Sequence, residues 1–128
     1  MKKETANWLS SAEYDLETAG NMFDSGRYIY TVFMCHLAIE KSAKAVVVEV
    51  AGKEPPRSHD LQYLIGLAGL ETDKGTLQFI AELSNLSVTT RYPVDFERAL
   101  SDFSQERAEV VLSRTKEVFE WIKKQIES

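Results

Sequence analysis

The longest apolar stretch of the chain runs from residue 28 to residue 50 and reads YIYTVFMCHLAIEKSAKAVVVEV. At about 100° per residue, its apolar side chains cover most of the circumference of a helix instead of one stripe. Among them we expect Phe33, Ile39 and Val47 to be almost fully buried. A helix that is apolar nearly all round must be covered by others, so this segment is predicted to lie at the centre of a helical bundle or in a subunit interface.

Shorter amphipathic segments flank this stretch. Residues 4–25 carry apolar side chains every three or four positions, which predicts a helix that ends before Gly26. Because the following turn is short, this helix should run antiparallel to the next one. A short helix is predicted after the proline-containing segment KEPPR, with Ser58 as its N-cap and Gly69 at its end.

Two further helices are predicted in the second half of the chain. The first begins near Thr72 or Asp73 and ends before Pro93, because the residue ahead of a proline is driven toward extended conformations. The segment SVTTRYPVDF is expected to be a connector, and Asp102 to cap the last helix. The pattern therefore predicts an all-α fold, an antiparallel up-and-down bundle of four long helices and one short helix.

Composition agrees with one domain over residues 1–128, since 44% of the side chains are hydrophobic and 27% are charged. The net charge of −5 gives no overall positive field, so contact with RNA or a nucleotide needs a local basic patch. One cysteine and two histidines are too few for a recognisable zinc motif, and we expect no metal or other cofactor. Without a signal-peptide or membrane-span pattern, a cytoplasmic protein that does not enter a membrane is expected.

Several motifs on these predicted helices together resemble the HEPN family, whose name stands for higher eukaryotes and prokaryotes nucleotide-binding. They are WxxxAxxDLxxA from Trp8, GRY from Gly26, IEKSAKA from Ile39, HDL from His59 and RYP from Arg91. The match extends from about Trp8 to the last helix, and its order and spacing are more specific than any one motif. The resemblance implies an antiparallel bundle that commonly forms homodimers.

Many HEPN proteins are ribonucleases that cut RNA without metal, using an arginine followed after four to six residues by a histidine and paired across a dimer. This chain lacks that motif, because neither His36 nor His59 follows an arginine at the required spacing. What remains resembles the small prokaryotic members often encoded beside a minimal nucleotidyltransferase. The resemblance implies that such a protein acts with the nucleotidyltransferase as a toxin–antitoxin or substrate-binding pair.

A partner of this kind needs cationic groups for phosphate and aromatic faces for bases. The candidates for nucleotide or RNA contact are Arg91, Tyr92, His59, Arg57, Lys44 and Lys41, with His36 and Glu40 as a supporting polar frame. Each has a structural alternative. His36 and Glu40 are four residues apart and could form a buried hydrogen-bonded pair or part of a metal site with no visible third ligand. Glu40 could equally hold Arg91 or Lys44 in place, and Arg91 with Tyr92 could brace helices.

Three interpretations of function are open. The first is a dimeric, non-catalytic protein that binds a nucleotide or RNA and partners a minimal nucleotidyltransferase. The second is a divergent metal-independent ribonuclease, a toxin in which folding or dimerisation brings His59 and Arg91 together. The third is an interaction scaffold that binds no ligand.

Overall fold

The computed structural model describes residues 1–127, and this part of the chain contains six helices and no strand. The four long helices are α1 (Lys3–Asp24), α2 (Tyr28–Ala51), α4 (Lys74–Arg91) and α6 (Gln105–Glu127), and the two short ones are α3 (Leu61–Leu67) and α5 (Phe96–Asp102). The all-α bundle predicted from the sequence is confirmed. The short helix α5 is an addition to the predicted set.

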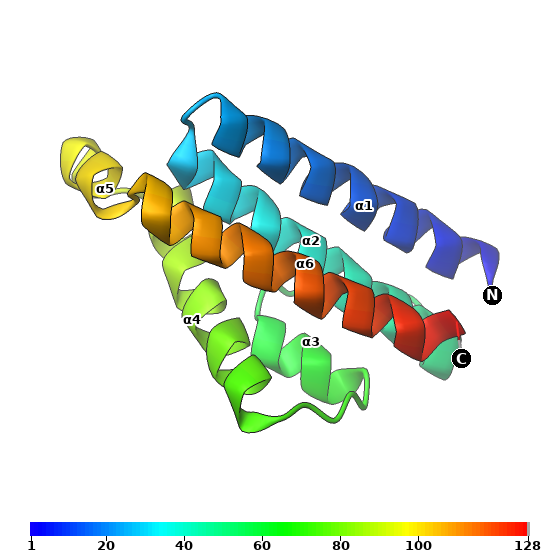
Figure 1. The fold of residues 1–128 in the computed structure, drawn as a ribbon. Coiled ribbons are helices and arrows are strands. Elements are labelled where there is room, and N and C mark those ends of the chain that lie inside the picture. Colours follow the sequence, from blue (N-terminus) through cyan, green and yellow to red (C-terminus); the bar gives the residue numbers. More distant parts are fainter. Residues whose placement is uncertain (128) are drawn as a thin grey trace.

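The helix α2 lies in the middle of the bundle and contacts each of the other five helices. Figure 1 shows α1 and α6 lying along it, with α1 running in the opposite direction to both α2 and α6. The helices α3 and α4 lie on another side of α2. Of the 24 residues of α2, 15 are buried, so the segment that is apolar nearly all round is the central one, as predicted.

The inward face of α2 differs at one position from the predicted face. Ile39 and Val47 are 0% and 2% exposed, as expected. Phe33 is only partly buried, and the expectation for this side chain was wrong. The guanidinium of Arg91 lies over its ring, with Cζ 5.7 Å from the ring centroid. A charged group at the end of α4, instead of an apolar helix face, therefore covers Phe33 and leaves it open to solvent at its edge.

Carboxylates cap α3 and α4 at their N-termini. Asp60 accepts a hydrogen bond from the Tyr63 amide at 3.2 Å, so Asp60 and not the predicted Ser58 is the N-cap of α3. The hydroxyl of Ser58 instead accepts from the Asp60 amide at 3.1 Å, in the turn before the helix. At α4 the predicted start is confirmed, since Asp73 accepts from the Thr76 amide at 2.7 Å.

The segment between α4 and α6 is more helical than predicted. The helix α4 continues to Arg91, after which Asp95 caps the short helix α5. Asp102 belongs to α5 and does not cap the last helix; the hydroxyl of Ser104 does so by accepting from the Arg107 amide at 3.2 Å. The helix α5 has seven residues like α3, but only Ala99 of α5 is buried, whereas α3 buries Leu61, Leu64 and Ile65. The weaker apolar pattern of α5, directly after the connector predicted around Pro93, explains why it was missed.

The start of α1 and the end of α2 are fastened to each other by side chains. The Nζ of Lys2 donates to the carbonyl oxygens of Val48 and Glu49, at 3.3 and 2.8 Å. The carboxylate of Glu49 accepts from the Lys2 amide at 3.0 Å and from the Thr5 hydroxyl at 2.8 Å. A cation at a helix C-terminus and an anion at a helix N-terminus are both favoured by the helix dipoles. This double contact holds the two helix ends together.

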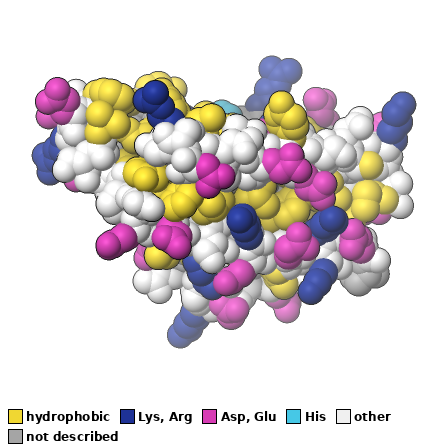
Figure 2. All heavy atoms as spheres, turned by 45° about the horizontal axis from the view of Figure 1, so that its top comes forward, with side chains coloured by type: hydrophobic (Ala, Val, Ile, Leu, Met, Phe, Trp, Pro, Cys, Tyr) yellow, Lys and Arg dark blue, Asp and Glu magenta, His cyan; other side chains and the backbone are white. Residues whose placement is uncertain are grey.

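Hydrophobic side chains also reach the surface. Figure 2 shows them in a band between charged side chains and gathered at one end of the molecule. The most exposed on α4, α5 and the turn between them are Val88, Tyr92, Val94, Phe96 and Leu100, each more than half exposed. None of the helices in residues 1–127 combines the length and the apolar character of a membrane span.

Candidate functional site

Glu40 is the centre of a polar cluster inside the bundle, and its side chain is only 5% exposed. Its Oε1 lies 2.8 Å from Nδ1 of His59 and 3.4 Å from Nε2 of His36. The Nη2 of Arg91 lies 3.9 Å from the same oxygen, and Nζ of Lys44 donates to Oε2 at 3.2 Å. The motifs IEKSAKA, HDL and RYP therefore meet at one carboxylate.

Three elements of the fold bring these side chains together. The spacing of four residues places His36, Glu40 and Lys44 on the same face of α2. His59 comes immediately before the N-cap of α3, so the capped start of that helix fixes its backbone beside Glu40. Arg91 is the last residue of α4, where the proline of RYP prevents the helix from continuing. The site is thus made by a central helix and by the ends of its neighbours.

The carboxyl of Glu40 is ionised at neutral pH in spite of its burial. Burial is the largest single influence on its pKa and raises it. The imidazoles of His36 and His59 and the ammonium of Lys44 together outweigh burial and hold the pKa at about 2. Because an ionised carboxylate only accepts hydrogen bonds, the hydrogen between Glu40 and His59 belongs to Nδ1 of the imidazole. A neutral His59 therefore presents an unprotonated Nε2.

The cluster opens to solvent through His59 and Arg91, whose side chains are 62% and 20% exposed. Lys44, at 7%, lies behind them with its Nζ 5.6 Å from the ring centroid of Trp8, and Arg91 lies over Phe33. Both contacts are favourable cation–π arrangements. Lys44 and Arg91 are two permanent cations that face the one carboxylate of Glu40. One positive charge is therefore in surplus even when the imidazoles carry none. An acidic protein therefore carries a local basic site at this point.

His36 belongs to the interior of the cluster. Its residue exposure is 0%, and neither ring nitrogen has a hydrogen-bond partner. The 3.4 Å approach of Nε2 to Glu40 is close enough for electrostatic attraction but lacks the geometry of a hydrogen bond. Within residues 1–127, no group of three or more His, Cys, Asp or Glu side chains has the arrangement of a metal site. His36 therefore lies inside the cluster with its Nε2 close to Oε1 of Glu40.

Three of the candidate contact residues lie apart from the Glu40 cluster. Lys41 forms an ion pair with Asp15 of α1 at 2.8 Å and donates to the Ser11 hydroxyl at 2.8 Å. Tyr92 is 75% exposed and lines a depression between α4 and α5. Arg57 is exposed in the loop between α2 and α3. Tyr92 thus lines a hollow different from the cluster in which Arg91 contacts Glu40.

Two aromatic residues of the site were not among the contact residues named from the sequence. Trp8 and Phe33 are partly buried, and each ring lies against a cation of the cluster. Their helical spacing alone cannot distinguish a core position from one at the edge of a site. The only sequence signal for Trp8 is its place in the WxxxAxxDLxxA motif, which does not reveal that Lys44 is the cation beside it.

Replacing Glu40 by Gln keeps the shape of the side chain but removes the charge that neutralises Lys44. We expect the free energy of unfolding at pH 7 to fall by about 3 kcal/mol. The pKa of the Glu40 carboxyl is 4.5 in the unfolded chain and about 2 in the folded one, and each unit of this difference corresponds to about 1.36 kcal/mol. Because the folded pKa is the lower one, this contribution is complete above pH 4.5 and lost as the pH falls to about 2. Urea unfolding followed by circular dichroism measures both effects.

The exposed Glu54→Gln is the matched control and should unfold like the wild type. A Glu40→Gln variant as stable as the wild type at pH 7 would show that the buried carboxylate does not hold the cluster together.

Comparison with known proteins agrees with this architecture. The HEPN domain family matches residues 5–125. No curated protein is significantly similar in sequence. Among solved structures, TT1696 from Thermus thermophilus superimposes with a TM-score of 0.81 at 18% identity, over 96% of this chain and 98% of that one. The protein ST0689, described as an archaeal HEPN homologue, gives a TM-score of 0.78 at 24% identity, over 98% and 99%. These two likenesses show the fold, and the family match over nearly the whole sequence shows that the chain belongs to the HEPN domain family.

Proposed function

We propose that this HEPN-domain protein binds the phosphate of a nucleotide or RNA at His59 and Arg91, without catalysis, as the partner of a minimal nucleotidyltransferase in a toxin–antitoxin-like pair. The observation that carries the proposal is the surplus positive charge that surrounds the buried Glu40 and opens to solvent. The nucleotidyltransferase partnership rests on the family resemblance. The phosphate contact rests on the geometry of the cluster.

Arg91 has the donors that a phosphate needs. Its guanidinium is 3.9 Å from Glu40, and among residues 1–127 it makes no hydrogen bond. A guanidinium carries five N–H donors in a planar fork that matches two oxygens of a phosphate. His59, held by Glu40 through Nδ1, has a side chain that is 62% exposed, and its Nε2 can donate to a phosphate oxygen when the imidazole carries a proton on both nitrogens. Lys44 is too buried for direct contact and contributes its charge from behind.

Replacing Arg91 by Ala tests the phosphate contact. We expect the affinity for a short fluorescent RNA to fall roughly 10- to 100-fold, since a hydrogen bond to a charged group is worth about 1.5–3 kcal/mol. Fluorescence anisotropy measures the change. Arg98→Ala on α5, where the side chain is 80% exposed, is the matched control and should bind as the wild type does. Equal affinities of Arg91→Ala and the wild type for the RNA would show that Arg91 does not contribute to binding.

The hydrogen bond between Glu40 and His59 supports a second candidate function, metal-independent cleavage of RNA. With Nδ1 protonated toward the carboxylate, Nε2 of His59 can take the proton of a ribose 2′-hydroxyl. The 2′-oxygen then bonds to the adjacent phosphorus, the bond from phosphorus to the 5′-oxygen breaks, and the leaving oxygen takes a proton from water. Arg91 would stabilise the negative charge that develops on the phosphoryl oxygens.

Incubation with total RNA and with tRNA in the presence of EDTA separates the two functions. Under the binding proposal we expect no cleavage, in keeping with the absence of the family's arginine-to-histidine motif. Cleavage that is lost in His59→Ala and in Arg91→Ala but kept in Arg98→Ala would replace the first function by the second. A protein that neither binds nor cleaves RNA or nucleotides would be the ligand-free scaffold.

The same proposal includes an isologous homodimer, as the family resemblance implies. The face of α4 and α5 supports it, because it exposes several large apolar side chains that a monomer would leave in water. Val88 on α4 and Leu100 on α5 are 58% and 53% exposed, and Tyr92 between them is 75% exposed.

Charged substitutions on that face test the dimer. We expect light scattering to give about twice the monomer mass of 14.5 kDa for the wild type and the monomer mass for Val88→Glu combined with Leu100→Glu, because an interface cannot bury unpaired carboxylates. Val50→Glu, at a 71% exposed position near the end of α2, should remain dimeric. A wild-type protein that is only monomeric would contradict the proposed dimer.

A further inference from the structure

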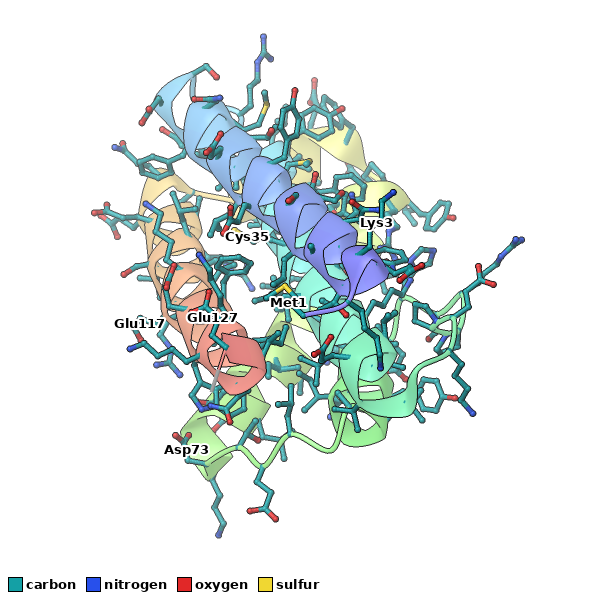
Figure 3. All side chains as sticks on the ribbon, turned by 90° about the vertical axis from the view of Figure 1, so that its right-hand side faces the viewer. Met1, Lys3, Cys35, Asp73, Glu117 and Glu127 are labelled. Carbon is teal, nitrogen blue, oxygen red and sulfur yellow. The ribbon has the colours of Figure 1, made fainter. Side chains whose placement is uncertain are left out.

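A concavity lies at the end of the bundle that carries Met1 and Lys3 (Figure 3). It lies between the start of α1, the end of α2 and the loop that follows α2, and its volume is about 430 Å³. Sites for small molecules typically measure about 300–1,000 Å³. Its lining includes Lys2, Glu4, Trp8, Lys53 and Glu54. We call this concavity the Trp8 pocket.

Trp8 joins the pocket to the Glu40 cluster. Its indole lines the pocket, and Nζ of Lys44 lies 5.6 Å from the ring centroid. The same Nζ donates at 3.2 Å to Oε2 of Glu40, whose Oε1 is 2.8 Å from His59. A continuous series of short contacts thus leads from the wall of the pocket to the phosphate-binding residues.

The Trp8 pocket and the cluster differ in charge. Two lysines, Lys2 and Lys53, and two glutamates, Glu4 and Glu54, line the pocket, so its formal charge is zero. The carboxylate of Glu49 already accepts hydrogen bonds at the N-terminal end of α1, which makes that end unattractive for a second anion. The cluster has a surplus positive charge. The neutral part of a ligand therefore suits the pocket, and its anionic part suits His59 and Arg91.

We propose that the Trp8 pocket is a nucleobase subsite, in which a base stacks on the indole of Trp8 while the phosphate of the same nucleotide contacts His59 and Arg91. This inference rests on the proposed phosphate binding and deepens it from a phosphate site to a nucleotide site. Aromatic side chains bind bases of any sequence, because every base has a π-face. The ligand class is a nucleoside monophosphate or a terminal nucleotide of RNA, and a phosphate without a base fills only part of the site.

Calorimetric titration of the wild type with AMP and with ribose 5-phosphate measures the contribution of the base, because the two ligands carry the same phosphate. We expect AMP to bind roughly tenfold or more tightly, in line with the usual strength of base stacking. Trp8→Leu should remove this preference, so that the variant binds AMP and ribose 5-phosphate with equal affinity. Trp121→Leu, the same substitution at the partly buried tryptophan of α6, should keep the preference. Arg91→Ala should lower the affinity for both AMP and ribose 5-phosphate.

A fluorescence measurement covers the case in which Trp8→Leu does not fold. Trp121→Phe leaves Trp8 as the only tryptophan, and AMP, unlike ribose 5-phosphate, should then quench its emission. Equal affinities of the wild type for AMP and ribose 5-phosphate would overturn the base subsite and leave the phosphate site standing. A preference for AMP that persists in Trp8→Leu would also overturn it. If neither ligand binds, the proposed function fails together with the subsite.

Discussion

The burial of one ionised carboxylate on the central helix is the constraint on which the site depends. A buried charge without partners is very costly, so Glu40 requires cations and hydrogen-bond donors from whatever packs around α2. His59 and Arg91 supply them from two segments that are distant in the sequence. The carboxylate therefore holds the loop before α3 and the end of α4 against α2. Lys44 and Arg91 carry two positive charges, and Glu40 neutralises one of them. The same contacts therefore leave a basic site at the surface.

The fold places uncharged rings on both sides of this basic site. Phe33 lies under Arg91, and Trp8 lies beside Lys44. Neither ring is fully covered, and each has a cation beside it. The fastening of α1 to the end of α2 through Lys2 and Glu49 holds the start of α1, and the Trp8 pocket lies at this end.

The accuracy of the sequence-based predictions follows the strength of the hydrophobic pattern in each element. Long helices repeat their hydrophobic period over several turns, and their ends at Gly26 and Asp73 carry local signals, so they were predicted correctly. The helix α5 buries only Ala99 of its seven residues and directly follows a proline-containing connector, and its absence from the prediction made Asp102 look like the cap of α6. Phe33 was predicted to be buried because its helical position is apolar, and the pattern gives no sign that an arginine covers it.

The sequence by itself determined the helical class, the central place of residues 28–50 and the resemblance to the HEPN family, because periodicity and motif order are local properties of the chain. It also nominated Glu40, His59 and Arg91. Only the tertiary structure decided that His59 and Arg91 both lie within 4 Å of Glu40, that Lys41 pairs with Asp15, that Tyr92 lines another hollow, and that Trp8 lines a pocket and contacts Lys44. The physical reason is that such contacts join different helices, and their geometry depends on how the helices pack together.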